Sequence, residues 1–177
     1  LGSGSQLGLA VARAISELQG RALPVRELAK MVGRGGTSGI GTAAFEHGGF
    51  IVDGGHCFGV GREKTDFRPS AASRGIQPPP VIARHDFPSD WRILIAIPDL
   101  PAGVSGNAEI DIFRERCPVP LEEVREISHE VLMRMLPGIA GRDLDLFGSS
   151  VNAIQNLGFK KVELSLQPAP VTGLLDV

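Results

Sequence analysis

The sequence lacks tyrosine altogether, and aromatic residues make up only 5% of its 177 positions, so stacking surfaces are scarce. An excess of charge of either sign is also missing, because 18 Lys and Arg stand against 20 Asp and Glu. A formal net charge of −2 argues against nucleic acid as the main partner. Since no apolar run approaches the roughly 18 residues of a membrane span, we expect no membrane partner either.

Cysteine is nearly absent as well, with only Cys57 and Cys117 in the chain. Their separation does not match a metal site, and neither has a base at a spacing that would make it a catalytic thiol. We therefore expect reduced cysteines and a cytoplasmic protein. Glycine, in contrast, is abundant, and eleven of the 23 glycines fall between Gly33 and Gly61.

Small residues open the chain and lead directly into a helical pattern. Residues 1–6 read Leu-Gly-Ser-Gly-Ser-Gln, and residues 7–19 have apolar positions at helical spacing. Glycines let the backbone approach an anion, and the free amides of a first helical turn point toward it. The alternative is a serine-capped helix after a flexible turn. The predicted phosphate ligands are the small residues of the opening turn: Gly2, Ser3, Gly4 and Ser5.

A second group of small residues follows a short helix predicted at residues 25–32. Residues 34–41 read Arg-Gly-Gly-Thr-Ser-Gly-Ile-Gly, and a short helix (residues 42–46) and a strand within 48–56 follow. Arg34 can bind phosphate or carboxylate through two hydrogen bonds, or it is a solvated surface arginine. Asp53 is a candidate magnesium ligand, or it caps its own turn.

The composition changes in the middle of the chain. Residues 62–80 are polar and proline-rich, which predicts a mobile linker and a domain boundary. After it we predict a buried strand at residues 91–98, a final strand at 161–166, and two amphipathic helices between them, at 121–136 and 143–157. This order is typical of an α+β sandwich.

Several blocks together resemble a known superfamily, the GHMP small-molecule kinases. The opening loop resembles their phosphate loop, and residues 37–44 with the following Gly48-Gly49 resemble their Ser-Gly-x-Asp segment and downstream strand. The second half resembles one branch in particular, the β-ribofuranosylaminobenzene 5′-phosphate synthases. The blocks that carry this resemblance are residues 90–98, 105–109, 132–137 and 147–159.

The resemblance implies a GHMP kinase-like, two-domain α+β fold. Residues 1–80 would be the C-terminal part of the phosphate-binding domain plus the linker, and residues 81–177 an incomplete ferredoxin-like domain. Because no strand leads into the opening loop, we expect an internal part of a longer protein, incomplete at both ends and inactive alone. Ser38 and Gly39 would line the phosphate site, and the protein would be a homodimer.

The resemblance also implies the reaction. The related synthases join phosphoribosyl pyrophosphate to para-aminobenzoate or para-hydroxybenzoate and release pyrophosphate and carbon dioxide, in methanopterin biosynthesis. Mg²⁺ would be the cofactor that stabilises the departing pyrophosphate. One departure from the kinases matters, because Gly41 stands where their pattern carries the aspartate base. Glycine cannot accept a proton, so the kinase route through this position is closed.

Two other functions stay open at this point. One is a GHMP-type kinase that uses ATP and takes its base from elsewhere in the protein. The other is a non-catalytic relative that keeps the fold and binds no donor.

Overall fold

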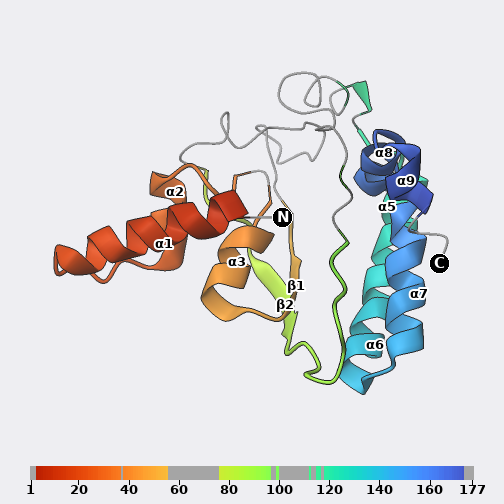
Figure 1. Ribbon diagram of the computed structural model, residues 1–177, viewed down its shortest axis with the longest axis horizontal. Coiled ribbons are helices and arrows are strands. Elements are labelled where there is room, and N and C mark those ends of the chain that lie inside the picture. The colour runs from red at the N-terminus through yellow and green to blue at the C-terminus, as the bar shows by residue number, and fades with distance from the viewer. Residues whose placement is uncertain are drawn as a thin grey trace. The chain divides into compact units, whose positions relative to one another are not determined.

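The computed structural model describes residues 3–36, 38–55, 76–96, 99, 112, 115–116 and 118–173. Contacts within the chain divide it into two compact units, Leu1–Asp86 and Phe87–Val177. The described part is mostly helical with a small two-stranded sheet (Figure 1), which is consistent with the predicted α+β class. Among the described helices, none is both long and apolar enough to cross a bilayer.

The first unit, unit 1, packs helices around a small apolar core. Its helices are α1 (Ser3–Leu18), α2 (Val25–Met31) and α3 (Ile40–His47). The predicted helix at residues 25–32 is thereby confirmed, and Pro24 precedes it with a φ of −58°, which suits entry into a helix. The fully or almost fully buried side chains of this core are Leu9, Val25, Leu28 and Ala29.

The sheet of unit 1 joins two segments that are far apart in the sequence. Strand β1 (Phe50–Asp53) pairs antiparallel with β2 (Val81–His85), with Ile51 opposite Arg84 and an irregularity between Val52 and Asp53. The sequence predicted β1, but not β2. Because β2 pairs with β1, the contacts place it in unit 1; the predicted domain boundary after residue 80 stays a prediction.

Three consecutive prolines precede β2, and each lies against one glycine of unit 1. A Cβ added to Gly35 would lie 2.6 Å from Pro78, and one added to Gly39 would lie 2.7 Å from Pro79. The proline carbonyls act as acceptors, since Arg26 donates to Pro78 and Pro79, and the amide of Gly54 donates to Pro80 over 2.8 Å.

These contacts limit the predicted mobile linker. Residues 78–80 accept hydrogen bonds from Arg26 and Gly54, and Gln77 donates to Glu27. The rest of the linker, residues 62–75, lies outside the described residues, and its mobility stays a prediction.

The second unit, unit 2, is helical throughout its regular described structure. Helix α5 (Leu121–His129) continues through the π-helix η2 (Glu130–Met135) into α6 (Leu136–Gly141). Helix α7 (Leu144–Gln155) follows, and α8 (Gly158–Ser165) and α9 (Ala169–Thr172) complete the unit (Figure 1). The helices predicted at 121–136 and 143–157 are confirmed.

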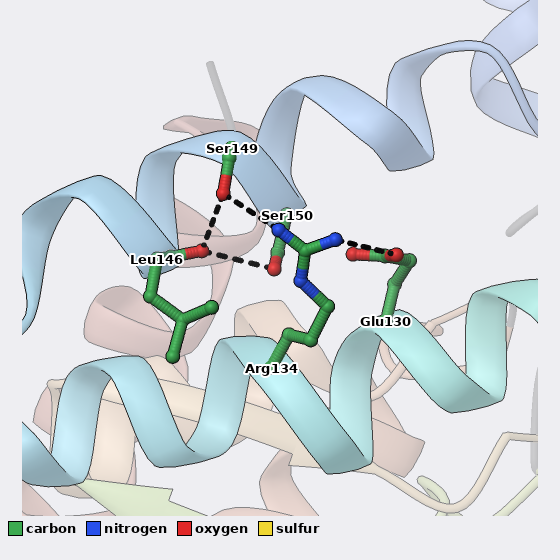
Figure 2. A network of polar contacts seen from close by, with 5 residues as sticks. All are labelled: Glu130, Arg134, Leu146, Ser149 and Ser150. Carbon is green, nitrogen blue, oxygen red and sulfur yellow. Dashed lines mark hydrogen bonds and ion pairs between the residues drawn. The ribbon is translucent and has the colours of Figure 1, made fainter.

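Side chains connect these helices. Figure 2 shows Arg134 of η2, which contacts the carboxylate of Glu130 at 3.4 Å and donates to the hydroxyl of Ser149 on α7 at 3.0 Å. Where α6 and α7 approach most closely, Gly138 leaves no room for a Cβ, which would lie 2.8 Å from the amide nitrogen of Phe147. Phe147 also joins a ring cluster with Phe87 and Trp91, with centroids 5.3–6.3 Å apart.

Both strands predicted in the second half are corrected by the structure. Residues 161–165 belong to helix α8, because an alternation of only five residues fits a helix as well as a strand. Residues 91–96 form no strand, and Ile93, Leu94 and Ile95 are exposed rather than buried. Residues 97 and 98 lie outside the described part. The ferredoxin-like architecture of this region stays a prediction.

The helical pattern of residues 121–136 predicts that Met133 and Met135 lie in the core, and this is right for one of them. Met135 is 4% exposed, whereas Met133 is 64% exposed. Both methionines lie in the π-helix η2, whose turns are wider than those of an α-helix, so regular helical spacing does not predict which side chains are buried.

Candidate anion-binding site

The opening residues form a helical turn rather than a loop. Helix α1 begins at Ser3, so the predicted small-residue turn before the helix is corrected: Ser3, Gly4 and Ser5 are its first turn. The first amides of a helix have no partner within the helix, and the helix dipole adds roughly half a positive charge there. An anion therefore remains a suitable ligand for these residues. Gly2 lies outside the described residues.

Arg34 brings a side-chain cation to the same place. A Cβ added to Gly4 would lie 3.3 Å from Nη2 of Arg34, so glycine at this position lets the guanidinium lie directly beside the first turn of α1. Arg34 is half-buried, and within the described part of the chain its guanidinium has no hydrogen-bond or ion-pair partner. The structure thus brings together two of the predicted site elements, Arg34 and the start of α1.

The start of α3 meets the same turn of α1. A Cβ on Gly41 would lie 3.1 Å from Cβ of Ser5 and 3.3 Å from its hydroxyl oxygen. The side chain of Gln6 donates to the carbonyl of Gly41 over 2.9 Å. Glycine at position 41 therefore permits the close approach of two helix starts. This gives a structural reason for glycine at position 41 that does not depend on the resemblance to the kinases.

Asp53 fixes the loop before α3. Its Oδ2 accepts the amide of Gly39 at 2.8 Å, and its Oδ1 accepts the amide of Gly55 at 2.9 Å. Ser38 is exposed, and its hydroxyl accepts the amide of Ile40 at 3.3 Å. The amides of Gly39 and Ile40 are thus donated to protein oxygens, whereas the first amides of α1 have no partner within the helix. The roles predicted for Ser38 and Gly39 stay predictions.

The contacts of Asp53 match the turn-capping alternative that the sequence left open. In the described part of the chain, no three or more His, Cys, Asp or Glu residues are grouped so that they could hold a metal ion. Mg²⁺ is commonly bound by one or two carboxylates together with substrate phosphates. The magnesium role of Asp53 accordingly stays a prediction.

Two contributors escaped the sequence analysis. Gln6 ties α1 to α3, and Arg26 ties α2 to the proline segment. Neither residue belongs to a recognisable motif, and their partners lie 35 and 53 residues away in the sequence, so no local signal marks them.

Comparison with known proteins shows that the chain is similar to enzymes of one name. No protein-family model matches the chain. A β-ribofuranosylphenol 5′-phosphate synthase from Methanothermobacter thermautotrophicus is 54% identical over 176 residues, which is 99% of this chain and 52% of the relative. The synthase of the same name from Methanocaldococcus jannaschii is 53% identical over 176 residues, 99% of this chain and 53% of the relative.

A third relative gives the same result. The β-ribofuranosylphenol 5′-phosphate synthase from Archaeoglobus fulgidus is 53% identical over 177 residues, covering the whole chain and 55% of the relative. The chain thus spans about half the length of the curated relatives it matches. The resemblance to the ribofuranosyl phosphate synthases is confirmed: over its whole length, this chain is a homologue of the β-ribofuranosylphenol 5′-phosphate synthases of these three organisms.

Proposed function

We propose that this chain contributes to an enzyme that joins phosphoribosyl pyrophosphate to para-aminobenzoate or para-hydroxybenzoate, as a step of methanopterin biosynthesis. The observation that carries the proposal is the identity of 53–54% to the synthases along the entire chain. We also propose that the whole protein has the GHMP kinase-like architecture that the sequence blocks suggest.

In the proposed reaction, the ring carbon exchanges its bond to the carboxylate for a bond to C1 of the ribose, and C1 loses its bond to pyrophosphate. The bond between C1 of the ribose and the pyrophosphate oxygen breaks, and pyrophosphate leaves with the electron pair. The ring carbon that carries the carboxylate supplies the electrons of the new bond to C1. The bond from that ring carbon to the carboxylate then breaks, its electron pair restores the aromatic ring, and carbon dioxide leaves.

This chemistry asks the protein mainly to hold anions and to stabilise departing negative charge. In unit 1, the amides of the first turn of α1 suit that task, because the start of a helix is positive and its first amides have no partner within the helix. Mg²⁺ on the pyrophosphate would neutralise further charge. Among the described residues Asp53 alone is a candidate ligand for it, so we assign the metal mainly to the phosphates of the substrate.

Gly41 favours this reaction over a kinase reaction. A side chain at position 41 would have to fit against Ser5, where even a Cβ is crowded at 3.1 Å. An aspartate base at this position, in the first turn of α3, therefore fits poorly. A synthase needs no base here, because the attacking ring carbon loses carbon dioxide instead of a proton.

Product analysis tests the proposal. The full-length protein is mixed with Mg²⁺, phosphoribosyl pyrophosphate and each benzoate in turn, and the products are identified by mass spectrometry. We expect pyrophosphate, carbon dioxide and a ribosylated aromatic 5′-phosphate. Phosphorylation of a small alcohol by ATP would support a kinase instead. If calorimetry detects no binding of the donor with Mg²⁺, the chain is a non-catalytic relative.

Gly4→Val tests where the donor binds. A branched side chain at position 4 would stand beside the first turn of α1 and hinder the approach of an anion to its backbone amides. We expect donor binding by the full-length protein to weaken by several kcal/mol, roughly 2–4, as for lost charged hydrogen bonds. Unchanged affinity would place the donor elsewhere.

We further propose that the full-length protein is a cytoplasmic homodimer. Its mass in solution, measured by light scattering, tests the dimer.

A further inference from the structure

We propose that the end of the α1–α2 groove nearest Arg34 is the subsite for the aromatic acid, with Arg34 binding its carboxylate. This inference rests on the proposed function, because it assigns a place in this chain to the acceptor of that reaction. It chooses carboxylate from the two anions, phosphate and carboxylate, that the sequence left open for Arg34, and names the substrate that carries it.

The groove has the size and character of a small-molecule site. It encloses about 620 Å³, within the range of roughly 300–1,000 Å³ typical of ligand pockets. Leu7 and Val11 of α1 line it and are 68% and 51% exposed, so an apolar ligand would cover surface that is otherwise in contact with water. At the end near Arg34 the wall is completed by Gly8 and Val32.

Arg34 supplies the complementary charge at that end. The groove is otherwise mainly apolar there, and the guanidinium has no partner among the described residues. Two other arginines of unit 1, in contrast, have partners: Arg26 donates to proline carbonyls, and Arg84 contacts Asp86 at 2.6 Å. An apolar channel that ends at an available guanidinium is complementary to a flat ring carrying one carboxylate.

The chemistry of the reaction requires this orientation. The ring carbon that attacks the ribose is the one that bears the carboxylate, so the carboxylate must lie at the donor end of the ring. Arg34 lies beside Gly4, at the first turn of α1 where we place the phosphates. A carboxylate on Arg34 therefore directs the reacting carbon toward the donor, and the rest of the ring extends along the groove past Gly8.

Gly8 provides the room for the ring. A Cβ at this position would meet only a methyl group of Val32, at 4.0 Å, so Gly8→Leu adds its bulk to the groove without a clash at the backbone. Filling or emptying an apolar pocket by a few methyl groups changes discrimination by about 10–200-fold.

The experiment measures both substrates in the full-length protein. We expect Arg34→Met to raise KM for para-hydroxybenzoate by about 10–100-fold, as for a lost charge-assisted hydrogen bond, with a much smaller change for phosphoribosyl pyrophosphate. Gly8→Leu should likewise raise KM for para-hydroxybenzoate much more than KM for phosphoribosyl pyrophosphate. Binding of the acid and of its neutral amide, followed by saturation-transfer NMR, should become equal in Arg34→Met, and Arg34→Lys should restore part of the preference.

Arg21→Met is the matched control. Arg21 lines the opposite end of the same groove, beyond the end of α1, and its side chain likewise has no partner among the described residues. It should leave both KM values unchanged. Equal effects of Arg34→Met and Arg21→Met on the acid overturn the subsite, as does a lowered melting temperature with unchanged KM in Gly8→Leu, which would mean that polypeptide fills the groove.

The two proposals fail in different ways. If the wild-type protein forms product but its KM for the acid does not depend on Arg34, the subsite is wrong and the function stands. If it forms no product yet binds para-hydroxybenzoate in an Arg34-dependent way, the function is wrong and the subsite stands. Absence of both product and binding overturns both.

Discussion

The contacts within unit 1 differ in kind from the contacts within unit 2. In unit 1, glycines let backbone segments approach, as at Gly35 and Gly49, and the buried apolar core is small. In unit 2 a glycine also permits a close approach, at Gly138, but there long side chains reach between helices, as Arg134 does toward Ser149 and as Glu123 does toward the amide of Gly158. Backbone-to-backbone proximity leaves amides and grooves near the surface for ligands, whereas side-chain bridges consume their polar groups internally. The candidate site accordingly lies in unit 1.

The largest effect should come from a glycine of unit 1. Gly49 has a φ of +82°, and a Cβ there would lie 2.4 Å from the backbone oxygen of His85. Gly49→Ala should lower the free energy of unfolding by about 2–5 kcal/mol, through the left-handed conformation and the clash together. Urea denaturation measures the loss. Gly48→Ala, at φ +59° with nothing within 4 Å, should cost only about 1–2 kcal/mol; equal losses would show that close approach is not what holds this unit.

A charge at the junction of α1 and α3 should weaken donor binding next. Gly41→Asp places a carboxylate against Ser5 and close to the expected phosphates, and we expect a loss of roughly 1–4 kcal/mol in the binding of phosphoribosyl pyrophosphate. Gly41→Ala controls for the added bulk and should lose less. Calorimetry on the full-length protein compares the affinities of these variants. If Gly41→Asp and wild type bind phosphoribosyl pyrophosphate equally well, its phosphates do not lie at this junction.

In unit 2 the side-chain bridge of Figure 2 should matter more than a surface pair. Glu130 is 8% exposed, and its Oε2 has no hydrogen-bond partner among the described residues, so Arg134 is its main compensation. Arg134→Met should cost about 1–3 kcal/mol, because a largely buried carboxylate then loses its cation. Arg125→Met removes only the exposed pair with Glu122 and should cost about 0–1 kcal/mol.

Chemical denaturation measures both variants. Adding Glu130→Gln to Arg134→Met should recover part of the loss. A double variant as unstable as the single one would mean that Arg134 acts through packing alone.

The smallest effect should depend on pH. The amide of Gly158 donates to Glu123 over 2.7 Å, and this bond, with a smaller contribution from Lys161, holds the pKa of Glu123 below its usual value. A lowered folded-state pKa stabilises the fold above the unfolded pKa of about 4.5, and this stabilisation is lost as the pH falls through the folded pKa.

Melting temperatures at several pH values check this. Glu123→Gln should be less stable than wild type at neutral pH, and the difference should shrink below about pH 4.5. Glu122→Gln, which loses only a contact with Arg125, should show no such convergence. A difference that is constant with pH would contradict the assigned role of Glu123.

Helical periodicity identified most helices, but it failed where the helix changes type. Along η2 and α6 the buried positions are Glu130, Met135, Gly138 and Ile139, so the first step is five residues long. A step of five fits the π-helix, which has wider turns than an α-helix. Leu132, which a regular helix over residues 121–136 would place on the apolar face, is 51% exposed.

Other errors have their cause in distant contacts. Helix α8 begins at Gly158, whose amide donates to Glu123, 35 residues earlier, and no local pattern contains that information. The site was predictable in part because Arg34 and the opening serines lie in recognisable small-residue segments. The contact of Gln6 with Gly41 and the contacts of the prolines with Gly35 and Gly39 were not predictable, because they join segments that meet only after folding.

The pairing of prolines with glycines has a consequence for the entropy of folding. Glycine loses more conformational freedom on folding than any other residue, and unit 1 orders many glycines around its site. Pro78, Pro79 and Pro80 already have restricted φ angles in the unfolded chain, so ordering them costs comparatively little. By resting Gly35, Gly39 and Gly54 against these prolines, the fold immobilises its most flexible residues with its stiffest ones.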